Sequence, residues 1–111
     1  MRSVSALEER FLRLWQRRSD ILLEREYPGI PNRKFRFDFC HPSTRVAIEI
    51  QGGIWVGGRH SGGVGQLRDF EKLNLAILGG WSVFQLSSEM ISDFWIDLIA
   101  AKIRRGGAYE Q

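Results

Sequence analysis

Near its N-terminus the chain has the spacing of polar and apolar residues that is typical of an amphipathic helix. Within 5–18 the apolar side chains recur at intervals of one, three and four residues, at Leu7, Phe11, Leu14 and Trp15. Ser5 precedes Glu8 by three positions, which is the spacing of a capping box at the start of a helix. The sequence therefore predicts a helix over 5–18.

Two later segments alternate between apolar and polar positions, as half-buried strands do. The apolar positions are Phe35, Phe37 and Phe39 in 34–40, and Val46, Ile48 and Ile50 in 45–51. Turn-forming residues at 41–44 join the two segments, so we expect a hairpin. A further short strand is expected at 21–27, before the Pro-Gly pair at 28–29.

A glycine-rich segment, 52–65, follows the hairpin and holds seven of the 12 glycines in the chain. We interpret it as a loop whose backbone can approach a ligand closely. A second helix is predicted over 66–78, ended by Gly79 and Gly80. Its apolar side chains are Leu67, Phe70, Leu73, Ile77 and Leu78, and its more polar side carries Arg68, Asp69, Glu71 and Lys72. A strand over 81–86 and a helix over 88–105 complete the order α-β-β-β-α-β-α, an α/β fold in a single domain over 1–111.

Composition narrows the function classes only a little. The chain has 111 residues, 43% of them hydrophobic, which is enough for one core. Its net charge of +3 permits a polyanionic partner without requiring one. The single cysteine, Cys40, excludes an internal disulfide, and with two histidines it leaves too few ligands for a structural zinc site. The sequence has no apolar run long enough to span a membrane, so we expect a soluble, cytoplasmic protein with no membrane partner.

The predicted hairpin brings acidic residues together. If its phenylalanine and aliphatic positions face the core, Asp38, Glu49 and Gln51 share the opposite face. Two close carboxylates repel unless a cation lies between them, and oxygen ligands on rigid strands suit Mg²⁺ or Mn²⁺. The plainer alternative is a solvated acidic pair, although Glu49 lies in an otherwise apolar run.

The same residues resemble the D…(D/E)xK signature of the PD-(D/E)XK nuclease superfamily, with Gln51 where lysine is commoner. A longer series of segments is similar, in the same order, to small phage and bacterial endonuclease-domain proteins related to the very-short-patch-repair endonucleases. The segments are Leu7-Glu8 with Phe11, Arg25-Glu26-Tyr27, 33–39, 49–55, Gly58-Arg59-His60, Asp69-Phe70-Glu71-Lys72 and Gly80-Trp81. The resemblance implies a restriction-endonuclease-like fold, with a mixed central β-sheet flanked by helices, in an intracellular and in some cases phage-encoded protein.

The resemblance also implies an activity, which is Mg²⁺- or Mn²⁺-dependent hydrolysis of DNA phosphodiester bonds to leave 5′-phosphate and 3′-hydroxyl ends. Carried over by position, Asp38 and Glu49 are metal ligands, and Gln51 replaces the lysine that orients or activates water. An amide orients a water molecule but carries no positive charge. We therefore expect Lys72 to supply that charge and His60 to contact substrate or water.

Two more acids have competing interpretations. Glu8 is either the partner of Ser5 in the capping box or, by the resemblance, a first-helix acid that faces the metal pocket. Asp69 either pairs with Lys72 on a solvated helix face or, by the resemblance, supports the active site.

We expect the protein to bind DNA and to recognise a DNA structure, a nick or a short sequence. A homodimer would add specificity to so small a chain. The candidate DNA-binding residues are Lys34, Arg36, Trp55, Arg59, His60 and Arg68. Trp55 could stack on a base or cover the sheet edge, and Arg10, Arg13 and Arg17 could face phosphates or solvent. Two other classes stay open: a nucleic-acid-binding module that lost catalysis together with the motif lysine, and a structural protein whose acidic pair is incidental.

Overall fold

The structure, a computed structural model, describes residues 5–51 and 64–106. Its helices are α1 (Ala6–Arg18), α2 (Val64–Leu78) and α3 (Asp93–Arg104), and its strands are β1 (Glu24–Tyr27), β2 (Phe37–His41), β3 (Val46–Ile50) and β4 (Ser82–Leu86). Short 3₁₀ turns lie at Pro42–Thr44 and Ser88–Met90. Within the described ranges this is the predicted order of helices and strands.

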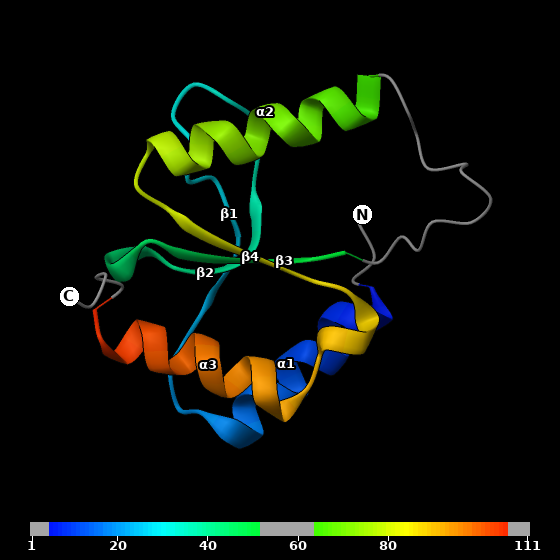
Figure 1. Ribbon diagram of the computed structural model, residues 1–111, viewed down its shortest axis with the longest axis vertical. Coiled ribbons are helices and arrows are strands. Elements are labelled where there is room, and N and C mark those ends of the chain that lie inside the picture. The colour runs from blue at the N-terminus through cyan, green and yellow to red at the C-terminus, as the bar shows by residue number, and fades with distance from the viewer. Residues whose placement is uncertain (1–4, 52–63, 107–111) are drawn as a thin grey trace.

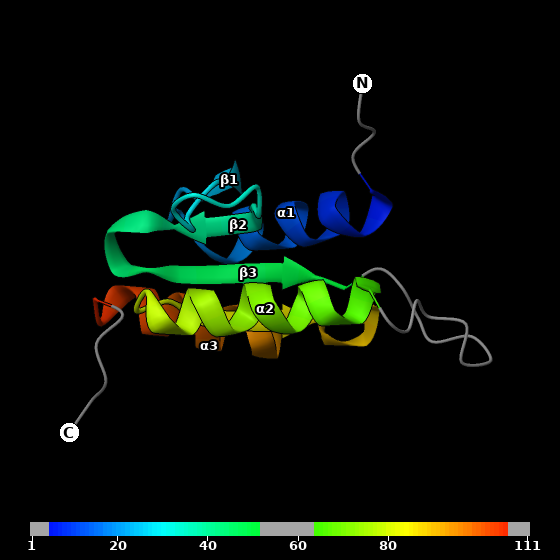
Figure 2. The same cartoon turned by 90° about the horizontal axis from the view of Figure 1, so that it is seen from above.

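The four strands form one mixed sheet in the order β1-β2-β3-β4. The predicted hairpin is β2 and β3, which pair antiparallel, as do β1 and β2, whereas β3 and β4 are parallel. Helix α2 lies on one side of the sheet, and α1 and α3 lie on the other side (Figure 1). In the view from above α2 and β3 extend along the same direction of the molecule (Figure 2). Helix α2 precedes β4 in the chain and packs against it. The expected α/β fold with a mixed sheet between helices is confirmed.

Each face of the sheet has its own apolar core. The face toward α1 and α3 buries a large cluster that includes Phe11, Trp15, Phe39, Val46, Ile48, Leu86, Ile96 and Ile99. The face toward α2 buries a smaller one, made of Ile30, Phe37, Cys40, Ala47, Ala76 and Trp81. Strand β3 contributes to both clusters because its side chains alternate between the faces.

Helix ends follow the signals in the sequence, with one exception. The Ser5 hydroxyl accepts a hydrogen bond from the Glu8 N–H at 3.0 Å, and Gly80, with φ of 85°, follows the end of α2. The predicted last helix is divided, however. Ser92 accepts a hydrogen bond from the Trp95 N–H and caps α3, so the helix begins at Asp93, and the preceding segment contains only a 3₁₀ turn.

The expectation that three phenylalanines share one face was wrong. Phe39 packs toward α1, whereas Phe37 lies on the α2 side, 4.6 Å from Trp81 between ring centroids. The neighbouring strand changes face at the same level, because Arg25 lies over the Phe39 ring and Tyr27 lies against Trp81. On β1 the change of face occurs at Glu26, between Arg25 and Tyr27, where φ of 50° interrupts the regular alternation.

The orientation of α2 also differs in part from the interpretation of its sequence. Lys72, from the polar side, lies against the sheet together with Leu75 and the small, buried Ala76. Four of the apolar side chains that mark the helix in the sequence are 55–82% exposed, namely Leu67, Phe70, Ile77 and Leu78. The physical reason is on the sheet, where Glu49 gives Lys72 an ionic partner.

Among the described residues no helix has the length and apolarity needed to cross a bilayer.

Candidate active site

The register of the hairpin places Asp38 beside Glu49. Phe39 pairs with Ile48, so the next position on each strand carries an acid. The side chains complete the local hydrogen bonding: the Asp38 N–H donates to Glu49 Oε2 at 3.1 Å, and the Ile50 N–H donates to Asp38 Oδ2 at 2.8 Å. These contacts fix both carboxylates on the strands, as the alternation of the hairpin predicts.

Both acids are costly to ionise in this position. Burial raises the pKa of Asp38, and the neighbouring charges of Glu8 and Glu26 raise it further, against the lowering effect of the Ile50 N–H and Lys72. Burial also raises the pKa of Glu49, although Lys72 opposes this shift. A cation beside these carboxylates would lower the free-energy cost of ionising them. Acids with such shifted pKa values are common at functional sites.

Lys72 lies on α2, which follows the glycine-rich segment in the sequence, and its side chain extends to this site. Its ammonium lies 2.7 Å from Glu49 Oε1 and also donates to the Arg36 carbonyl oxygen at 2.7 Å. The ammonium is 5.8 Å from the centre of the Phe37 ring, and the side chain is only 21% exposed. A fixed positive charge therefore lies beside the acidic pair, although the motif position holds Gln51.

A three-carboxylate group adjoins the pair on the side of Asp38. Glu8, Glu26 and Asp38 each offer one oxygen, and the three oxygens lie within 4.8 Å of one another. Glu8 comes from the first turn of α1, and its side chain is 6% exposed. The Glu8 N–H donates to the Ser5 hydroxyl at the start of the helix, while the Glu8 carboxylate lies in this group, as the resemblance implies.

Glu26 is the acid of this group that the sequence pattern does not predict. Its position follows from the pairing of β1 with β2, which sets it opposite Asp38, and from its left-handed backbone. The sequence contains the acid and the short strand. It does not reveal the pairing register or the sign of φ, so the available signal was only that Glu26 lies in a segment similar to the endonuclease-domain proteins.

The other candidate residues lie around this centre or outside the described ranges. Gln51 directly follows β3 and is exposed, with its N–H donating to the Leu86 carbonyl at 2.8 Å. Asp69 is exposed on α2, and Lys72 is directed to Glu49. Lys34, Arg36 and Arg68 are exposed. Trp55, Arg59 and His60 lie outside the described residues.

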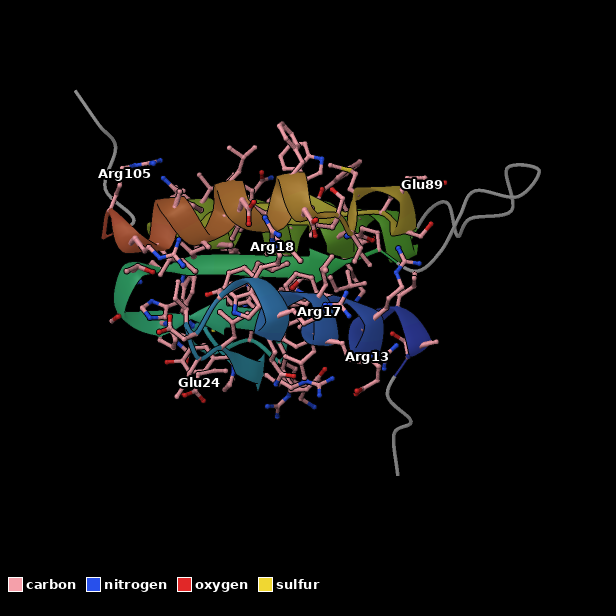
Figure 3. The ribbon with its side chains drawn as sticks, turned by 90° about the horizontal axis from the view of Figure 1, so that it is seen from below. Arg13, Arg17, Arg18, Glu24, Glu89 and Arg105 are labelled. Atoms are coloured by element: carbon pink, nitrogen blue, oxygen red, sulfur yellow. The ribbon has the colours of Figure 1, made fainter. Side chains whose placement is uncertain are left out.

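The arginines of α1 are exposed, and two of them have partners within the protein. Arg13 and Arg17 are exposed on the outer side of the layer formed by α1 and α3 (Figure 3). Arg18 bridges to α3, with its Nε 3.2 Å from Asp97 Oδ1, and Arg10 donates to the Ser88 carbonyl. For Arg10 and Arg18 the structure thus gives partners within the protein.

The donor set fits a hard divalent cation. Carboxylate oxygens are the preferred ligands of Mg²⁺ and Mn²⁺, and two oxygens on opposite sides of an octahedral Mg²⁺ are about 4.2 Å apart. The three oxygens near Asp38, all within 4.8 Å, need only small movements to share such an ion. Because thiol and imidazole donors are absent from this group, zinc is the poorer fit.

Comparison with known proteins gives one clear result. Searches for a matching family model and for a matching curated protein found none. Among solved structures, the catalytic domain of the homing endonuclease I-Bth0305I matches with a TM-score of 0.57 and 19% sequence identity. The alignment covers 93% of this chain and 94% of that one. The two chains share a fold. The expected nuclease-like architecture is thereby confirmed at the level of the fold.

Proposed function

We propose that this chain is a metal-dependent endonuclease that hydrolyses DNA phosphodiester bonds, leaving 5′-phosphate and 3′-hydroxyl ends. The observation that carries the proposal is the carboxylate group around Asp38, set beside the Lys72–Glu49 ion pair. The shared fold with a homing endonuclease catalytic domain supports the same activity. Cleavage directed to a nick or to a DNA structure is the form we favour.

Asp38 and Glu49 are the proposed metal ligands, and Glu8 and Glu26 offer further oxygens on the other side of Asp38. When bound, Mg²⁺ or Mn²⁺ would lower the pKa of a water molecule and stabilise charge on the scissile phosphate. The Ile50 N–H orients the Asp38 carboxylate, and the Asp38 N–H orients that of Glu49. These two bonds hold the carboxylates in fixed orientations on the strands.

In this proposal Lys72 and Gln51 together replace the usual motif lysine, with Lys72 supplying the positive charge and Gln51 orienting the water. Lys72 places its ammonium beside Glu49, where it can stabilise negative charge on a phosphate. Gln51, exposed at the end of β3, orients the attacking water through its amide. His60 and Asp69 remain proposed supports.

DNA is the proposed partner. Lys34, Arg36 and Arg68 supply exposed positive charge in the segments that flank the site, and Trp55, Arg59 and His60 are proposed to extend that surface. A homodimer is also part of the proposal. The outer side of α2 exposes Leu67, Phe70 and Ile77 at the spacing of a helix–helix seam, and a two-fold contact would let this stripe meet itself.

The second candidate function is a nucleic-acid-binding module that keeps the fold without catalysis. The replacement of lysine by Gln51 favours it, and the position of Lys72 opposes it. A structural protein with an incidental acidic pair would bind neither DNA nor metal through these residues.

A cleavage assay with several DNA forms separates the three. Purified protein with Mn²⁺ or Mg²⁺ is incubated with supercoiled, nicked, branched and single-stranded DNA, in parallel with Asp38→Asn and the exposed control Asp20→Asn. We expect cleavage by the parent and by Asp20→Asn, and loss of cleavage in Asp38→Asn. DNA binding without cleavage on every form would favour the binding module. Absence of both binding and cleavage would favour the structural protein.

A further inference from the structure

Arg25, on β1, is held between two elements next to the carboxylate group. Its Nη2 lies 3.4 Å from Glu8 Oε1, and its Nη1 lies 3.5 Å from Glu9 Oε2. The guanidinium carbon is 4.9 Å from the centre of the Phe39 ring. Two carboxylates and an aromatic face thus fix the orientation of the planar guanidinium, which a single contact would leave free to rotate.

Because of the backbone conformation at Glu26, the consecutive side chains of Arg25 and Glu26 both lie near Glu8. In a regular strand Arg25 and Glu26 would point to opposite faces. With φ of 50° at Glu26, the Glu26 carboxylate lies within 4.8 Å of an oxygen of Glu8, and Arg25 contacts Glu8 as well. The short strand β1 therefore places the Glu26 carboxylate in the group and the Arg25 guanidinium beside it.

Glu8 needs an opposing charge where it lies. Its side chain is 6% exposed, and the oxygens of Glu26 and Asp38 are close to it. A carboxylate buried beside two others is costly unless a cation compensates it. The distance of 3.4 Å to Arg25 is longer than the 2.7–2.9 Å or so of a strong charge-assisted hydrogen bond. A divalent cation beside the group would add a second compensating charge.

We infer that Arg25 is a positioning residue of the metal site, which holds the Glu8 carboxylate in place toward Asp38 and Glu26. This inference rests on the proposed function, because it takes the carboxylate group to be a metal site. Arg25 itself touches neither metal nor substrate. It acts through Glu8, in the way that partners of metal ligands keep those ligands oriented.

Titration calorimetry with Mn²⁺ tests this on the chelator-treated full chain. Arg25→Met removes the charge, and Arg25→Lys keeps it on a side chain that cannot span Glu8 and Glu9 together. Arg18→Met is the matched control, since Arg18 also contacts two carboxylates, Asp93 and Asp97, on the layer of α1 and α3. Thermal unfolding without metal is recorded for each variant, so that a loss of fold is recognised.

We expect Mn²⁺ to bind Arg25→Met about ten- to hundredfold more weakly than the parent, with Arg25→Lys between them and Arg18→Met unchanged. If Arg25→Met fails to fold, Arg25→Lys decides. Affinity equal to that of the parent in a folded Arg25 variant would overturn the inference, and so would tighter binding, which would make Arg25 a competitor of the ion. A parent that binds no Mn²⁺ would overturn the proposed metal site as well.

Discussion

The ion pair between Lys72 and Glu49 makes a quantitative prediction about stability. The variant Lys72→Met keeps most of the side-chain volume and removes the charge, so the Glu49 carboxylate loses its ammonium partner at 2.7 Å. Breaking a buried pair costs about 3–5 kcal/mol, and an exposed pair is worth about 0–1 kcal/mol. The side chains of Lys72 and Glu49 are 21% and 13% exposed, so we expect a loss of about 2 kcal/mol. For a chain of this length that corresponds to a fall of roughly 8 °C in Tm.

The loss of stability in Lys72→Met should depend on pH, and the ionisation of Glu49 sets the direction of that dependence. Burial raises the pKa of Glu49 and Lys72 lowers it, so Lys72→Met raises that pKa further. An acid with a raised folded-state pKa contributes stability below its unfolded pKa, and this contribution is lost as the pH rises through the folded value. The deficit of Lys72→Met relative to the parent should therefore be largest above neutral pH and should shrink on acidification.

The assay is thermal unfolding in chelator, at about pH 8 and about pH 5, for the parent, Lys72→Met, Glu49→Gln and the double variant. The double variant should recover part of the loss, since it removes the uncompensated charge. Arg33→Met is the control: Arg33 and Glu71 form an exposed pair at 3.2 Å, and its loss should cost less than about 1 kcal/mol at either pH. Additive effects of the two single changes, or a deficit independent of pH, would show that Lys72 does not compensate the charge of Glu49.

Three further predictions concern the core and the outer face of α2. Cys40 is buried and its pKa is raised to about 12, so its thiol should react with a disulfide reagent at pH 8 only as fast as the chain unfolds; rapid labelling of the folded protein would contradict this. Gly29→Ala should lower stability by about 1–3 kcal/mol in denaturant unfolding, because the new Cβ would lie 2.6 Å from a Phe37 ring carbon; an unchanged midpoint would contradict it. Phe70→Glu on α2 should abolish a dimer in sedimentation analysis while Phe94→Glu on α3 should not, and the same mass for parent and both variants would rule out the α2 contact.

The acidic pair could be predicted because it needs only a short stretch of regular pairing. Phe39 and Ile48 face each other, and the next positions along both strands must then carry Asp38 and Glu49 to the same place. The prediction that Asp38 and Glu49 lie side by side is confirmed, even though Phe37 lies on the other face. Alternation next to the Phe39–Ile48 pair was sufficient to place the two acids, whereas alternation did not hold along the whole of 34–40.

The rest of the site depends on features that have no periodic signal. The left-handed backbone of Glu26 and the register of β1 against β2 bring that acid to Asp38, and neither can be read from residue spacing. The orientation of α2 was obscured for a related reason. Its strongest apolar pattern lies on the exposed side, and the contact of Lys72 with Glu49, together with the small Ala76, decides which side meets the sheet.

Cleavage of supercoiled DNA is the most direct test of the central claim, that the carboxylates around Asp38 form a metal-dependent nuclease site. The parent and Asp38→Asn are compared with Mn²⁺ and with chelator, and the ends of any product are identified by labelling. We expect metal-dependent cleavage by the parent alone, with 5′-phosphate and 3′-hydroxyl ends. Intact DNA in every sample of folded parent, or equal cleavage by Asp38→Asn, would contradict it.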